Sequence, residues 1–351
     1  MKQIVQDQRL LDKRLVVFIV AIAVWLNWLF ILSPNTAFAT LFENWEIALT
    51  MAFGSIVAGA TSVGGGAVAF PVFTKVLEIS PDDAKAFSLA IQSVGMSAAA
   101  ITIIVNKITV DWKIIRWGSL GGLIGIWLGL GHFSSVFTPS LTKFSFTLIL
   151  SSFALVLLFT NQSDRRCHSN VPIWTLREQS IVLGTSIFGG VMSGLVGNGI
   201  DIVVFAIMVL LFRINEKVAT PTSVILMAIN AFSGLVLEQF VFQSFVEPAS
   251  SYFVAAIPVV VVGAPLGALL CQRLSRQTIV NILVSLIAIE FFSSMLLIPL
   301  HFSTLLIGIG ILLVFSFLNY RMYQSEYYDR PVNSDSEDIA LTVEPVTVYT
   351  R

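Results

Sequence analysis

The chain has 351 residues, of which 56% are hydrophobic and only 12% are charged, with a mean hydropathy of +0.87 and a formal net charge of −1. A soluble domain carries about 25% charged residues, so the composition excludes an ordinary soluble protein, and no basic patch indicates a nucleic-acid partner. Several apolar runs reach the roughly 20 residues that cross a bilayer as a helix, so we predict an all-α polytopic membrane protein.

The apolar segments follow one another with short polar connections. Two of them, 64–77 and 200–212, are short for a full crossing. The longer ones are 14–33, 46–63, 84–105, 112–136, 140–160, 178–196, 218–242, 249–271, 277–300 and 302–319.

These segments divide the chain into six regions. Residues 1–45 hold the first transmembrane helix and an outer loop, 46–160 a first membrane repeat, and 161–177 a cytoplasmic loop. Residues 178–300 form a second membrane repeat and 301–319 a last helix. The acidic stretch 320–351 is predicted to be a disordered, solvated cytoplasmic tail.

Lysine and arginine are concentrated in alternate loops. They occupy the amino terminus and the loops 106–116 and 161–177, whereas loops 34–45 and 243–248 have none. The positive-inside rule therefore predicts a multi-pass protein of the plasma membrane with both termini cytoplasmic. One alternative stays open for residues 1–39, because Ala37 and Ala39 form an A-x-A pattern that a signal peptidase could cleave. We favour an uncleaved helix, because the apolar core is longer than that of a usual signal peptide.

An internal repeat appears when the chain is shifted by 135 residues. The shift aligns "AGATSVGGGAVAF" (58–70) with "SGLVGNGIDIVVF" (193–205), and "EISPDDAKAFSL" (78–89) with "RINEKVATPTSV" (213–224). The loop before the first copy is predicted to be outside and the loop before the second inside, so the copies form an inverted-topology repeat. Each half then crosses an odd number of times. Three crossings per half, with 46–77 and 178–212 as broken or re-entrant hairpins, give about eight with the outer helices. Five crossings per half is also an odd number, so a total of twelve crossings stays open.

Both hairpins break at glycine clusters. Gly64, Gly65 and Gly66 form the first, and Gly197, Asn198 and Gly199 lie in the second. A helix that starts at such a break presents unpaired N–H groups and the positive end of its dipole to an anion. We therefore predict that the two breaks bind a small anion near the membrane midplane. The alternative is that these glycines serve only close helix packing.

Polar residues on the following helices are further candidates. Ser88 and Gln92 follow the first cluster, and Ser223 and Asn230 follow the second, where they could bind the anion or only bridge helices. Asp201 and Glu290 are intramembrane acids, which makes them candidates to carry a coupling proton. Asp201 could instead cap the helix that begins beside it.

At these residues the chain resembles the TauE/SafE family of sulfite and organosulfonate exporters. The resemblance rests on "GATSVGGGAVAFPVF" (59–73), "SPDDAKAFSL" (80–89), "SGLVGNGIDIVVF" and "NEKVATPTSV", and it spans nearly all of 46–300. It implies a multi-spanning carrier that moves sulfur-containing anions such as sulfite, sulfoacetate or thiosulfate, often outward. Asp201 departs from the glycine aligned with it, which a site for anions alone does not explain.

The leading hypothesis is therefore a secondary transporter of small sulfur-containing anions. The alternatives are an anion channel without coupling and a receptor-like membrane protein. No common catalytic or nucleotide-binding motif is present, so we expect neither an enzyme nor an ATP-driven pump, and we expect no cofactor and no metal site. The expected partners are the anion and the bilayer, and association into a homo-oligomer is left open.

Overall fold

A computed structural model describes residues 2–62, 72–134, 139–160, 167–297, 302–325 and 328. These residues form helices, and their only β-type pairing is an isolated bridge between His168 and Ile214. The helices are α1 (Lys2–Leu32), α2 (Pro34–Glu43), α3 (Trp45–Ala60), η1 (Val72–Val76), α5 (Pro81–Val105), α6 (Trp112–Leu128), η2 (Gly129–Phe133), α7 (Pro139–Thr160), α8 (Leu176–Val196), α9 (Ile200–Leu210), α10 (Glu216–Val236), η3 (Leu237–Val241), α11 (Ala249–Arg273), α12 (Arg276–Leu297) and α13 (Phe302–Gln324).

Eight helices in the described part of the chain are long and apolar enough to cross a membrane, which confirms the predicted class. They are α5, α6 with η2, α7, α8, α10 with η3, α11, α12 and α13. The set differs in one respect from the eight that we predicted. Helix α8 is long and apolar enough by itself, without α9, whereas the first helix qualifies only together with α2, from which it is bent by 102°. Counting that pair as one span gives nine.

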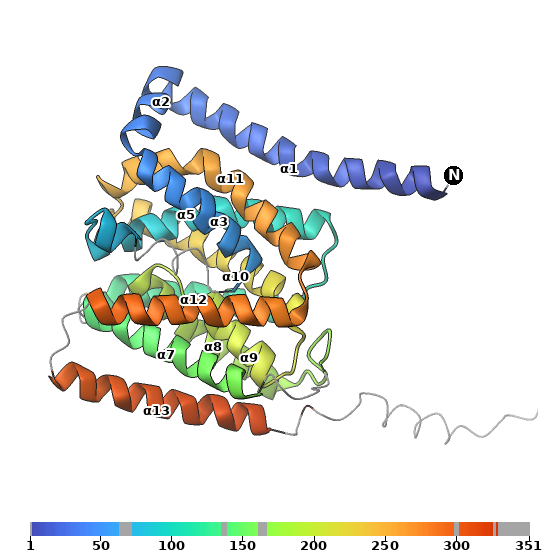
Figure 1. Cartoon of the computed structure of the whole chain (residues 1–351), viewed down its shortest axis with the longest axis vertical. Coiled ribbons are helices and arrows are strands. Elements are labelled where there is room, and N and C mark those ends of the chain that lie inside the picture. Colours follow the sequence, from blue (N-terminus) through green and yellow to red (C-terminus); the bar gives the residue numbers. More distant parts are fainter. Residues whose placement is uncertain are drawn as a thin grey trace, which may run out of the picture.

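The helices form a stack along the long axis of the molecule (Figure 1). Helices α1 and α2 lie at one end of this stack, and α13 lies at the other. Helix α1 packs on α11, where the indole N–H groups of Trp25 and Trp28 donate to the carbonyls of Pro258 and Val254 at 2.9 Å. Helix α13 packs on α7. The two repeats therefore occupy the middle of the stack.

The repeat is visible in the backbone of the turns between helices. Glu78 and Arg213, which are 135 positions apart, both adopt a left-handed conformation, with φ of 53° and 55°. Two residues later the equivalent helices α5 and α10 begin with side-chain caps. Ser80 accepts from the amide of Asp83 at 3.1 Å, and Asn215 accepts from the amide of Lys217 at 2.9 Å. Equivalent sequence positions therefore fold into equivalent helix starts.

The two halves also exchange equivalent contacts. Helix α3 packs on α11 of the other half, and α8 packs on α6. A Cβ added at Gly267 would lie 2.1 Å from the carbonyl oxygen of Ile56, and one added at Gly129 would lie 2.6 Å from that of Val191. Ile56 and Val191 are again 135 positions apart. The halves are thus related by a pseudo-two-fold axis, with α5 packed against α10 between them.

Three long helices, α5, α6 and α7, lie between α3 and α8 along the chain. An odd number of crossings places the start of α8 on the opposite side of the membrane from the start of α3. This is the arrangement that an inverted repeat requires.

The chain beyond the last helix is not wholly solvated. Helix α13 continues to Gln324, five residues past its expected end at 319, and Tyr328 is only 1% exposed. Its hydroxyl donates to Glu178 of α8 at 2.7 Å, and its ring packs edge-on against Phe212. Tyr328 therefore departs from the predicted solvated tail.

Candidate functional site

The second glycine turn joins α8 to α9 as a tight helical hairpin. Gly197 and Gly199 both adopt positive φ, of 91° and 156°. A Cβ added at Gly189 of α8 would lie 2.8 Å from the Cα of Ile200, so α9 folds back directly on α8. The first turn, with Gly64, Gly65 and Gly66, lies outside the described residues, and its predicted role stays a prediction.

One backbone amide at the start of α9 already has a hydrogen-bond partner. The amide of Ile200, the first residue of the helix, donates to the hydroxyl of Ser193 at 3.1 Å. A helix start binds an anion through such amides only when they are unpaired. The predicted cradle of backbone N–H groups is therefore reduced here by one donor.

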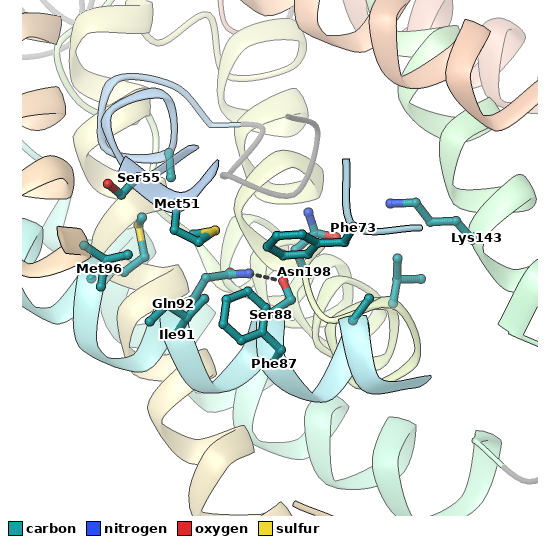
Figure 2. Close-up of a pocket in the computed structure, with 15 residues that line it drawn as sticks. Met51, Ser55, Phe73, Phe87, Ser88, Ile91, Gln92, Met96, Lys143 and Asn198 are labelled. Carbon is teal, nitrogen blue, oxygen red and sulfur yellow. Dashed lines mark hydrogen bonds between the residues drawn. The ribbon is translucent and has the colours of Figure 1, made fainter. Parts of the chain in front are cut away.

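A cavity of about 30 Å³ lies where the two halves meet, between α3, η1, α5, α7 and the second glycine turn. Figure 2 shows its lining, with Gln92 and Ser88 on α5 and Asn198 on the turn. A water needs about 10–15 Å³ by this measure, so the cavity has room for about two or three waters. Its lining side chains are Met51, Ser55, Ala58, Phe73, Ala84, Phe87, Ser88, Ile91, Gln92, Met96, Lys143, Val196, Asn198 and Val260, together with Gly95.

Ser88 and Gln92 connect α5 to the glycine turn of the opposite half. The Gln92 amide nitrogen donates to the carbonyl oxygen of Gly197 at 3.1 Å and to the Ser88 hydroxyl at 2.5 Å. The Ser88 hydroxyl also donates to the Gly197 carbonyl, at 3.3 Å. Both residues thus line the cavity with their donors directed at the turn, and their predicted role in binding an anion stays a prediction.

Ser223 of α10 makes the equivalent contact from the second half to the first. Its hydroxyl donates to the hydroxyl of Ser62 at 3.0 Å. Ser223 is the repeat partner of Ser88, and Ser62 is the repeat partner of Gly197, each 135 positions apart. Ser88 and Ser223 therefore make equivalent contacts between the halves, to Gly197 and to Ser62.

The two asparagines lie in different places. Asn198 lines the cavity, and its Oδ1 is buried without a hydrogen-bond partner among the described residues. Asn230 faces α6, where its Oδ1 would lie 3.0 Å from a Cβ added at Gly122. Asn198 is therefore the better placed of the two to meet a bound molecule.

Asp201 is the second residue of α9, and it is 1% exposed. Neither of its carboxylate oxygens has a hydrogen-bond partner in the described part of the chain, the backbone amides of the first turn of α9 included. A full cap, which would accept directly from these amides, is not formed.

Glu290 pairs with a residue that the sequence reasoning missed. Its Oε1 lies 2.7 Å from the Nζ of Lys143, and the two side chains are 2% and 8% exposed. Lys143 lines the cavity, on the side where Figure 2 shows Phe73 and Asn198. An ionisable residue inside the apolar run 140–160 was the available signal, because intramembrane charges mark functional sites by default.

No group of three or more histidine, cysteine, aspartate or glutamate residues in the described ranges is arranged to hold a metal ion.

Comparison with known families gives one match. The family model described as "Sulfite exporter TauE/SafE" matches residues 47–293, a range that encloses α5 to α11 and most of α3 and α12. No curated protein and no solved structure matches the chain.

Proposed function

The chain belongs to the TauE/SafE sulfite exporter family, and from this we infer that it is a membrane transporter of sulfur anions. We propose that it is a secondary transporter and that it exports a small sulfur-containing anion such as sulfite, a sulfonate or thiosulfate. The observation that carries the proposal is the cavity between the two halves, which Ser88, Gln92 and Lys143 line with hydrogen-bond donors. Transporters built from inverted repeats bind substrate at the repeat interface, in discontinuous helices near the midplane.

The cavity lining supports an anion as the ligand. Gln92 and Ser88 supply N–H and O–H donors, Lys143 supplies a positive charge, and the remaining lining side chains are mainly apolar. An amide group such as that of Asn198 can turn its NH₂ towards an anion, because oxygen and nitrogen exchange places on rotation. A few directed donors in an apolar, water-poor cavity are typical of small-molecule sites.

The donors of Gln92 and Ser88 are occupied by the Gly197 carbonyl. We propose that binding separates α5 from the glycine turn, so that the anion takes the place of the Gly197 carbonyl. The same separation would loosen the contact between the halves, which alternating access requires.

The experiment is uptake of labelled sulfite, thiosulfate, sulfate and taurine into proteoliposomes, with and without a proton gradient. A coupled carrier shows saturable flux of at least one sulfur anion and accumulates it against its own gradient. Protein-free liposomes and liposomes with heat-unfolded protein are the controls.

Two results would contradict the proposal. Flux that never saturates and never exceeds the electrochemical equilibrium of the anion indicates a channel. Absence of flux for the whole panel, with folded and inserted protein, removes sulfur anions as the substrate.

A further inference from the structure

The ion pair between Lys143 and Glu290 joins α7 to α12 inside the membrane-spanning bundle. The hydroxyl of Thr147 donates to the same Glu290 oxygen at 3.5 Å and lies 3.2 Å from the hydroxyl of Ser294. The other carboxylate oxygen, Oε2, is buried and has no partner among the described residues. Among the described residues, only one of the two carboxylate oxygens of Glu290 therefore has partners.

A purely structural role does not explain this pair well. Burying two charges costs more than their attraction returns unless the remaining hydrogen-bonding positions are filled, and here one oxygen is unfilled. The pair also adjoins the cavity, because Lys143 lines it, whereas Glu290 on α12 is not among the described residues that line it. A molecule in the cavity can therefore reach the ammonium group of Lys143 directly.

We propose that Lys143 is the cationic ligand of the transported anion, and that Glu290 is an internal anion that occupies Lys143 when the cavity is empty. When the substrate binds, its oxygen replaces Glu290 Oε1 at the ammonium group, and Glu290 takes up one proton from the aqueous side that supplies the anion. The ammonium group of Lys143 then pairs with the bound anion in place of the Glu290 carboxylate. This inference rests on the proposed transport of a sulfur anion and assigns its charge-carrying residues.

Several other charged groups on the helices around the pair have an interaction partner of their own. Lys85 interacts with Glu238, Glu216 pairs with Arg276, and Glu178 accepts from Tyr328. The remaining charged side chains on α5, α9 and α13 are those of Asp82, Asp83, Asp201 and Arg321. Of these, Asp201 is the buried carboxylate that competes with Glu290 as the proton acceptor.

The test is isothermal titration of the purified full chain with thiosulfate, which stays a dianion throughout the assay. For the wild type, one coupled proton makes the affinity rise by up to about tenfold for each unit that the pH falls, because protonation of Glu290 releases Lys143. Glu290→Gln should bind thiosulfate with an affinity that does not change with pH. Lys143→Met combined with Glu290→Gln, which removes both buried charges together, should weaken binding by about a hundredfold.

Two further variants separate this role from general effects. Arg276→Met with Glu216→Gln removes another ion pair, which is half-buried and lies outside the cavity, and should leave both affinity and pH dependence as in the wild type. Asp201→Asn should keep the pH dependence.

Some outcomes would overturn the assignment and leave the transport function standing. One is a Lys143/Glu290 double variant that binds thiosulfate as tightly as the wild type. Another is a pH dependence lost in Asp201→Asn and kept in Glu290→Gln. Failure of the folded wild type to bind or transport any sulfur anion would instead contradict the proposed function itself.

Discussion

At the scale of single residues, Gly197 is the position where backbone and site depend most closely on each other. Its φ of 91° is unfavourable for any residue with a Cβ, and a Cβ there would lie 2.8 Å from the carbonyl oxygen of Lys85 and 3.0 Å from the Cβ of Ser88. Its own carbonyl receives the hydrogen bonds of Ser88 and Gln92. Glycine is therefore required both for the turn and for the close approach of α5.

We expect Gly197→Ala to reduce thiosulfate flux by at least about tenfold, because the added methyl group moves α5 away from the turn and strains the backbone by about 1–2 kcal/mol. Flux into proteoliposomes, at matched amounts of inserted protein, measures the effect. The control is Gly310→Ala on α13, where an added Cβ meets nothing within 4 Å. Equal flux in the two variants would show that the turn does not need glycine.

At the scale of helices, glycines set how closely α6 and α8 approach each other. A Cβ added at Gly190 would lie 2.6 Å from the carbonyl oxygen of Gly122, and one at Gly194 would lie 2.8 Å from the amide nitrogen of Leu130. These neighbours are backbone atoms, which cannot rotate away as a side chain can. Small residues at such interfaces let membrane helices pack through van der Waals contact and are a common means of association.

We predict that Gly190→Ala and Gly194→Ala each destabilise the folded protein by about 1–3 kcal/mol, because the two helices must separate. Gly184→Ala, on the same helix α8 but with no atom within 4 Å of the added Cβ, should be neutral or should stabilise by up to about 1 kcal/mol through helix propensity. Thermal unfolding of the purified variants distinguishes these results. Similar midpoints for all three would contradict the packing explanation.

At the scale of the whole molecule, long-range contacts tie Ser325 and Tyr328, which follow α13, to the second repeat. Tyr328 is held between Glu178 of α8 and Phe212 at the end of α9, and its carbonyl oxygen lies 2.9 Å from the Nε2 of His168. Arg213 also donates to the carbonyl of Ser325, at 3.3 Å. Ser325 and Tyr328 therefore contact the end of the α8–α9 hairpin that is predicted to face the cytoplasm.

Tyr328→Phe should lower the free energy of unfolding by about 1.5–3 kcal/mol, the range for a buried hydrogen bond to a charged group. The matched control is Tyr320→Phe on α13, a tyrosine that is 48% exposed and should tolerate the change. Thermal unfolding combined with limited proteolysis of the chain end reports the difference. Identical melting and cleavage of the two variants would show that the anchor contributes nothing.

Much of the fold could be read from the sequence because membrane helices must satisfy their backbone within one segment. The apolar runs therefore predicted most helix positions to within a few residues, for example 84–105 against Pro81–Val105 and 277–300 against Arg276–Leu297. Helix α2 was missed, because Pro34–Glu43 follows a bend at Ser33 within a predicted loop. The candidate site was predicted in part, since Ser88, Gln92 and Asn198 line the cavity and Asn230 does not.

The sequence by itself determined the class of protein, the repeat and its equivalent positions, because these depend on local hydrophobicity and on matching residues along the chain. Only the tertiary structure decided which of the polar residues meet. Lys143 and Glu290 are 147 positions apart, and Ser88 and Gly197 are 109 apart, so no local pattern connects them. Their contacts follow from the pseudo-two-fold packing, which places Gly197 against α5 and α7 against α12 of the opposite half, and from the cost of leaving a charge unpaired inside a membrane.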